Sequence, residues 1–93
     1  MTLVLKKGST KKWTIIFPDG KKVSFGDPKY EDYTQHHDLK RQELYLNRHR
    51  AREDWTNIYT AGFWSRWLLW NKPSLNASIK DIEHRFKVRI QTA

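Results

Sequence analysis

The alternation of apolar and polar residues near the N-terminus predicts a small antiparallel sheet within residues 1–28. A short β-prone run covers Thr2–Lys6, and large apolar side chains recur at every second position of Lys12–Phe17. Pro18-Asp19-Gly20 favours a tight turn, because Pro presets its own φ and Gly accepts a positive φ. The run that follows, Lys21–Phe25, is therefore expected to fold back and complete a β-hairpin.

A helical region is predicted over residues 34–84. Residues 35–53 contain no Pro or Gly, and their content of Leu, Arg, Glu, Gln and Lys favours a helix, for which Thr34 is the expected N-cap. In the segment before this helix, Tyr30 and Tyr33 are expected to pack back onto the hairpin. One long helix beside the sheet follows from this pattern.

Two more helices are predicted in the second half of the chain. The first lies within Ala61–Pro73 (AGFWSRWLLWNKP), with Thr60 as its N-cap and the terminal proline as its end. Ser74 or Ser78 can cap the next helix, and Ser78 with Asp81 approximates a capping box. The expected buried stripe of this last helix is Leu75, Ile79, Ile82 and Phe86.

The period of the pattern changes from helical to twofold near the C-terminus. Apolar residues alternate with Lys87, Arg89 and Gln91 over residues 86–91, which predicts a closing strand with a basic outer face that could add to the N-terminal hairpin. The chain is thus expected to be a single small basic domain, residues 1–93, of the α+β class. Its expected architecture is an N-terminal antiparallel β-hairpin or small sheet packed against two or three helices.

The tryptophan-rich segment allows two interpretations. At helical spacing Trp64, Trp67 and Leu68 share one side, and Trp70 follows close behind. Aromatic side chains of this size dominate both protein cores and protein interfaces. The three tryptophans are therefore predicted to form either the core of the domain or a surface that docks on another protein.

Charge and composition point to an anionic partner. Eighteen Lys and Arg residues against ten Asp and Glu give a net charge of +8, which favours nucleic acid, an acidic protein surface or a lipid headgroup layer. The chain has no cysteine, so neither a disulfide framework nor a thiolate zinc site is available, and no cofactor is expected. No signal peptide or membrane span is predicted, and the expected location is the virion or the interior of a cell rather than the secreted space.

Basic residues in two places are candidates for contact with phosphate groups. Lysines cluster at the ends of the predicted hairpin, and arginines frame Tyr45 on one side of the predicted long helix, where the tyrosine could stack on bases. Protection of the sheet edge and a salt-bridged helix are the alternative explanations. The candidates are Lys11, Lys12, Lys21, Lys22, Arg41, Arg48 and Arg52.

Residues with metal-ligand chemistry are few. His36, His37, Asp38 and His49 are the only cluster, and a metal-dependent nuclease would need them to converge on one ion. Adjacent histidines on a helix point about 100° apart, and the spacing matches no strict motif. Capping or surface functions are the alternative for these residues. No catalytic residue is identified, and the chain is not expected to be an enzyme.

The chain resembles a family of small proteins encoded by large nucleocytoplasmic DNA viruses of algae and protists. The resemblance covers roughly residues 20–80, including Asp32-Tyr33-Thr34 and Arg48-His49, and its most specific part is the string GFWSRWLLWNKP within residues 61–73. It implies a giant-virus origin and, for a small basic protein, a virion component such as a minor capsid or internal protein. It implies no reaction.

Three functional hypotheses follow. The leading one is a non-catalytic structural protein of a large DNA virus, which binds other virion proteins or anionic partners. The first alternative is a nucleic-acid-binding protein that contacts phosphates through Lys and Arg, and it predicts a steep loss of affinity with salt. The second is the metal-dependent nuclease, which predicts a bound divalent metal.

Overall fold

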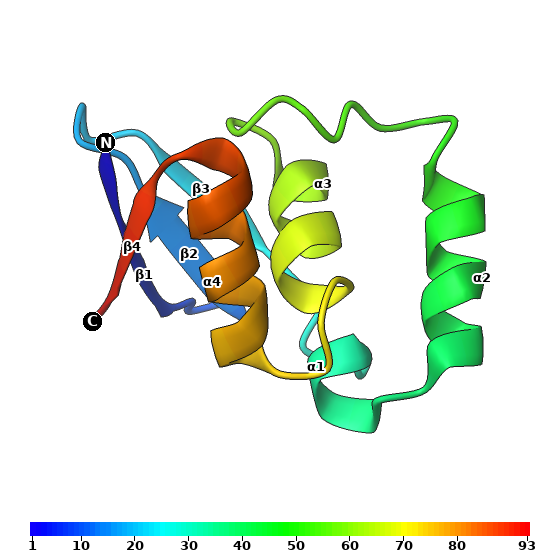
Figure 1. Cartoon of the computed structure of the whole chain (residues 1–93). Coiled ribbons are helices and arrows are strands. Elements are labelled where there is room, and N and C mark those ends of the chain that lie inside the picture. The colour runs from blue at the N-terminus through cyan, green and yellow to red at the C-terminus, as the bar shows by residue number, and fades with distance from the viewer.

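A four-stranded mixed sheet lies at one side of the molecule, and the helices gather on the other side of it (Figure 1). The structure is a computed structural model, and it describes all 93 residues. The strand order is β3-β2-β1-β4, with β1 antiparallel to β2, β2 antiparallel to β3, and β4 parallel to β1. The α+β class is therefore confirmed. The strands are β1 (Thr2–Lys7), β2 (Trp13–Ile16), β3 (Lys22–Phe25) and β4 (Arg89–Thr92).

The predicted β-hairpin is formed by β2 and β3. Phe17 donates its N–H to the carbonyl of Lys21, and Gly20 donates to the carbonyl of Phe17. Gly20 has φ +90, a conformation that residues with a Cβ adopt at a cost, so the turn depends on this glycine. Both strands are shorter than the predicted runs because the residues next to the turn close it instead of extending the ladder.

The helix predicted over residues 35–53 is two helices. They are α1 (Tyr33–His36) and α2 (Leu39–His49). His37 between them adopts φ 56, in the left-handed region, which ends α1. Asp38 then caps α2 by accepting hydrogen bonds from the backbone N–H groups of Lys40 and Arg41. The chain consequently turns between the two helices, and α2 stands apart from the sheet (Figure 1).

The start of the helical region also differs from the prediction. Thr34 is not the N-cap; Asp32 is, and its carboxylate forms a capping box with Gln35. Tyr33 is buried as expected, whereas the packing predicted for Tyr30 is wrong because its side chain is 69% exposed. Asp32 was overlooked because either residue type can cap a helix, and only its burial and contacts decide between them.

The tryptophan-rich segment begins as α3 (Ala61–Trp64) and continues as a π-helical turn, η1 (Ser65–Leu69). Thr60 caps it as predicted, by accepting a hydrogen bond from the N–H of Phe63. In the π turn the N–H of Trp70 bonds to the carbonyl of Ser65, five residues back. The wider turn rotates the residues after it relative to an α-helix, and in this arrangement Leu69 is buried in the core while Trp67 is only partly buried.

The last helix is α4 (Leu75–Phe86), capped by Ser74, whose hydroxyl accepts from the N–H of Ala77. The predicted Ser78–Asp81 capping box is wrong, because Ser78 is completely buried inside α4 and accepts a hydrogen bond from the N–H of Lys72. At twelve residues α4 is the longest helix, and none of the helices has the length and apolar character needed to cross a membrane.

The closing strand exists but starts later than predicted. Phe86 is the last residue of α4, and Lys87 takes φ 58, so β4 starts at Arg89. It pairs with β1, not with the hairpin strands. The first and last strands of the chain thereby lie side by side in one sheet.

The core fills the space between the sheet and the segments α3, η1 and α4. Ile79 and Ile82 of the predicted α4 stripe are buried, and Leu75 and Phe86 pack against the core at its edge. By contrast, α2 contributes no buried residue. The core residues are Leu3, Leu5, Ile15, Phe17, Phe25, Phe63, Trp64, Leu68, Leu69, Ile79, Ile82 and Ile90.

Candidate anion-binding surfaces

A cleft of about 800 Å³ lies between α2, the segment α3–η1 and the loops on both sides of the hairpin. Four of the seven predicted cationic residues line it: Lys11 and Lys12 from the loop before β2, and Arg41 and Arg48 from α2. The structure therefore brings together residues that are separated by up to 37 positions in the sequence. Tyr45 and Trp70 line the same cleft.

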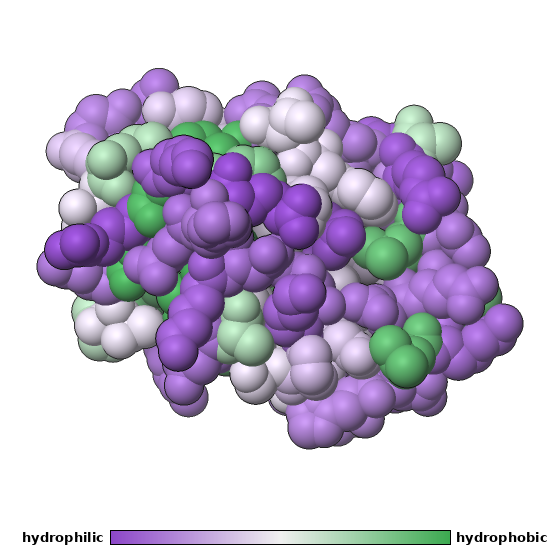
Figure 2. Space-filling view, in the orientation of Figure 1, coloured by the Kyte–Doolittle hydropathy of each residue, from purple (hydrophilic) through white to green (hydrophobic).

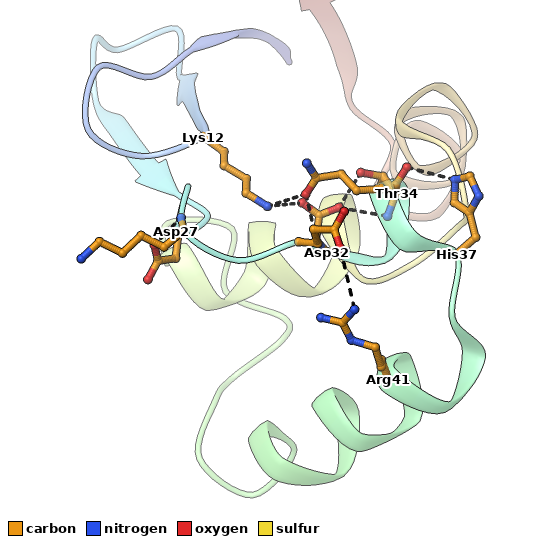
Figure 3. A network of polar contacts seen from close by, with 9 residues as sticks. Lys12, Asp27, Asp32, Thr34, His37 and Arg41 are labelled. Carbon is orange, nitrogen blue, oxygen red and sulfur yellow. Dashed lines mark hydrogen bonds and ion pairs between the residues drawn. The ribbon is translucent and has the colours of Figure 1, made fainter.

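Carboxylates balance the cations of this cleft. Lys12 Nζ lies 2.8 Å from Asp32 Oδ2 and 2.7 Å from Gln35 Oε1, and the Arg41 guanidinium lies 3.9 Å from Glu31. Figure 3 shows Lys12 reaching this network from the hairpin side and Arg41 from α2. The lining contains four Lys and Arg residues and four carboxylates, which are Asp27, Glu31, Asp32 and Glu53. The cleft is thus formally neutral and attracts a polyanion weakly.

A column of four rings holds α2 against the rest of the molecule. The rings of Tyr45 and Trp70 stack with centroids 4.4 Å apart and planes 3° apart. His49 packs on Tyr45 at 4.4 Å, and His36 packs on Trp70 at 5.4 Å. Trp70 is parallel to the Tyr45 ring and His49 is tilted by 30° to it, so two rings already pack closely on Tyr45. Tyr45 is therefore not free to stack on a base, and burial raises its pKa far above the ordinary value, with Glu53 adding to the effect.

The four candidate metal ligands do not come together. His36 Nδ1 accepts a hydrogen bond from the N–H of Asp38, whose carboxylate caps α2, and His37 is exposed, with Nε2 3.1 Å from the carbonyl of Thr34. His49 faces Glu53 at 3.3 Å. No group of three His, Cys, Asp or Glu side chains is placed to hold a metal ion. The arrangement therefore offers no support for the nuclease hypothesis.

The tryptophans belong to the core and its margin. Trp64 is 1% exposed and donates its Nε1–H to the carbonyl of Ile58. Trp67 donates to the carbonyl of Trp55, and the Arg66 and Arg85 guanidiniums lie 4.3 Å and 4.6 Å from its ring centroid. Burial, with repulsion from Arg85, lowers the pKa of Arg66. Trp64 is therefore a core residue, whereas Trp67 and Trp70 are partly exposed at the edge of the core.

The remaining predicted cations lie away from the cleft. Lys21 sits next to the hairpin turn, 3.9 Å from Asp19 and 5.0 Å from the ring centroid of Tyr59, while Lys22 begins β3. Arg52 is exposed beyond the end of α2. The seven residues consequently do not form one continuous surface.

A second basic surface lies on the side of the sheet that no helix covers. Paired residues of neighbouring strands point to the same side, so the strand register identifies its members. The sequence pattern identified Lys22 and the basic outer face of the closing strand. Lys6 was missed, because nothing local distinguishes it from other exposed lysines. This surface, called the open face below, comprises Thr2, Val4, Lys6, Thr14, Ile16, Lys22, Ser24, Arg89 and Gln91.

Acidic side chains are used to build the fold, whereas most basic ones are not. Only four of the eighteen Lys and Arg residues make an ion pair with a carboxylate, and these are Lys12, Lys21, Arg41 and Arg85. In contrast, eight of the ten acidic residues accept hydrogen bonds from the chain itself, at caps, turns and the start of β4. They are Asp19, Asp27, Asp32, Asp38, Glu53, Asp54, Asp81 and Glu83.

Comparison with known proteins connects the first half of the chain to a family. The model of a family of unknown function (DUF5754) matches residues 1–49, which run from β1 to the end of α2. The tryptophan-rich segment that carries the resemblance to viral proteins lies outside the matched residues. No curated protein and no solved structure matches the chain.

Proposed function

The chain belongs to a family of unknown function (DUF5754), and we propose that it is a non-catalytic structural protein of a large DNA virus that holds an anionic partner through its lysines and arginines. The observation that carries this proposal is the unequal use of the two kinds of charge. Fourteen of the eighteen Lys and Arg residues have no carboxylate partner. The viral setting rests on the resemblance of the GFWSRWLLWNKP segment.

The positive charges that have no carboxylate partner destabilise the folded state by mutual repulsion. A net charge of +8 on 93 residues makes the folded state repel itself, and the hydrogen-bonded carboxylates are largely committed to caps and turns. A polyanion relieves this repulsion and releases its own condensed counterions when it binds. The unpaired cations therefore favour association with a partner that carries many negative charges.

Binding of other virion proteins through apolar contacts has less support. On the side of the molecule drawn in Figure 2, hydrophilic side chains predominate and the apolar patches are small and separate. The large apolar side chains that remain exposed are Met1, Tyr30, Leu39, Leu44 and Tyr59, and none of them is a tryptophan. A specific protein interface is normally built around aromatic anchors, and the exposed large aromatic side chains here are Tyr30 and Tyr59 alone.

The test is a binding series against three polyanions at increasing salt. Labelled duplex DNA, heparin and polyglutamate are titrated with the purified chain, and uncharged dextran is the control. For four neutralised phosphates we expect the affinity for DNA to fall about a hundredfold between 50 and 200 mM salt. If none of the three polyanions binds at the lowest salt concentration, the proposed function is wrong.

A further inference from the structure

We propose that the open face of the sheet is the surface that takes the partner, and that this partner is the phosphate backbone of a nucleic-acid duplex. The inference rests on the proposed function, because it names the partner and the surface for the anion binding described above. Helices cover the opposite side of the sheet, where Leu3, Leu5 and Ile15 enter the core. The open face has no such cover (Figure 1).

Charge distinguishes the open face from the cleft beside α2, in which carboxylates match the cations in number. Its three cations, Lys6, Lys22 and Arg89, are exposed, and none lies within 4.0 Å of a carboxylate. None of its nine residues is acidic. Three of the others are exposed and carry groups that hydrogen-bond to phosphate or sugar oxygens: Thr2, Ser24 and Gln91. Thr14 lies among them but is only 7% exposed, and its hydroxyl pairs with that of Ser24. A surface with cations, hydroxyls and no carboxylate is complementary to a polyanion.

The spacing of the cations suits a duplex backbone. Lys6 is on β1, Lys22 is two strands away on β3, and Arg89 is on the neighbouring β4. With strands about 4.8 Å apart and residues about 3.3 Å apart along a strand, the three positions are roughly 12 to 16 Å from one another. This is comparable to the width of about 12 Å of the major groove of B-DNA. Each cation can therefore reach a separate phosphate, on either strand.

The chemistry of the open face disfavours other anionic partners. It contains no aromatic residue, so it lacks the stacking platforms on which single-stranded nucleic acids depend. Its apolar members, Val4 and Ile16, are partly buried and cannot insert into a lipid layer. The same lack of an exposed apolar anchor argues against an acidic protein.

The experiment compares two triple variants of the full chain that lose the same charge. One carries Lys6→Gln, Lys22→Gln and Arg89→Gln on the open face, and the control carries Lys40→Gln, Lys72→Gln and Lys80→Gln. The control lysines are exposed, make no ion pair and lie outside the sheet. Circular dichroism and thermal melting establish that both variants are folded. A further variant with Lys6→Arg and Lys22→Arg keeps the charge and is expected to bind as wild type does.

The readout is affinity for a duplex of about 20 base pairs over a salt series. Removal of three phosphate contacts is expected to reduce the slope of log affinity against log salt by about 2.7 and the affinity at about 100 mM salt more than tenfold. The control variant is expected to change the slope by less than about 1. If wild type binds the duplex and both triple variants weaken binding equally, the open face is not the site, although the proposed function stands.

The choice of partner is tested in the same series with single-stranded DNA of the same length and with polyglutamate. Tighter binding of either one than of the duplex would overturn the inference while leaving anion binding intact. Failure of wild type to bind any polyanion would overturn both proposals together.

Discussion

The cleft beside α2 and the open face of the sheet are both rich in lysine and arginine, yet they differ in what surrounds these residues. In the cleft, Lys12 and Arg41 face Asp32 and Glu31, which the loop before α1 brings to them. On the open face, the cations face no carboxylate at all. A lysine or arginine is therefore available to bind an anionic partner only where the fold has not already paired it with a carboxylate of the same chain.

The two regions also differ in the contacts that stabilise them. The sheet rests on a buried core, whereas α2 has no buried residue and depends on the ring column and on Gln42, which donates hydrogen bonds to the carbonyls of Trp70 and Asn71. Elements with few buried contacts open at a lower free energy than the global unfolding of the domain. The cleft is therefore bounded on one side by the less stable part of the molecule.

The largest expected effect is that of Trp64→Ala, which should destabilise the whole domain, including the sheet and the segment that bounds the cleft. Trp64 is almost completely buried, its ring contacts Phe25 of β3, and its loss also leaves the carbonyl of Ile58 without its donor. The free energy of unfolding should fall by about 4 kcal/mol, measured by urea denaturation. Tyr30→Ala, which removes an exposed aromatic ring, is the control and should change it by less than about 0.5 kcal/mol.

Tyr45→Ala should destabilise α2 without destabilising the sheet. Removing the ring between His49 and Trp70 is expected to lower the free energy of opening α2 by about 2 kcal/mol, because two aromatic contacts are lost together with their buried area. Amide hydrogen exchange should accelerate in α2 and stay unchanged in the sheet. Leu39→Ala, which changes an α2 side chain that is 68% exposed and outside the cleft, should change neither. Equal acceleration in both regions would show that α2 and the sheet open as one unit.

Lys12→Gln and Lys11→Gln compare a lysine that is paired within the fold with a neighbouring lysine that is not. Lys12 is part-buried and bonded to Asp32 and Gln35, so its replacement should cost about 1.5 kcal/mol of stability. Lys11 is exposed and unpaired, and its replacement should be neutral within about 0.5 kcal/mol. Thermal or urea unfolding of the two variants measures the difference. Equal stability of the two would mean that the network at Asp32 does not contribute to folding.

The smallest expected effect is a pH dependence that arises from His36. Burial lowers the pKa of this residue below its ordinary value of 6.5, and Arg41 adds to the effect, against the opposing attraction of Asp38, Glu31 and Asp32. As the pH falls below 6.5, the unfolded chain binds the proton first, so the free energy of unfolding decreases; above 6.5 His36 contributes nothing. Urea melts between about pH 7.5 and 5.5 should show a shallower decrease for His36→Asn than for wild type. If the free energy of unfolding decreases with the same slope in both proteins, the pH dependence arises from groups other than His36.

Much of the fold could be predicted from local patterns. The hairpin follows from Pro18-Asp19-Gly20 between two apolar runs, and the cap at Thr60 follows from residue type and position. Ser74 was one of two candidates for the cap of α4, and the structure decides for it. The candidate site could be predicted only in part. Lys11, Lys12, Arg41 and Arg48 were identified from charge, but the carboxylates that neutralise their surroundings lie on other segments.

The sequence by itself determined the class of the fold, its hairpin, the helix cap at Thr60 and its excess of positive charge, since these depend on composition and on interactions between near neighbours. Only the tertiary structure decided the break at His37, the burial of Leu69 in place of Trp67 at the π turn, and the pairing of β4 with β1 that puts Arg89 on the same face as Lys6 and Lys22. The reason is physical. Helix rotation and strand register are set by long-range packing, and which charges remain unpaired depends on that packing as well.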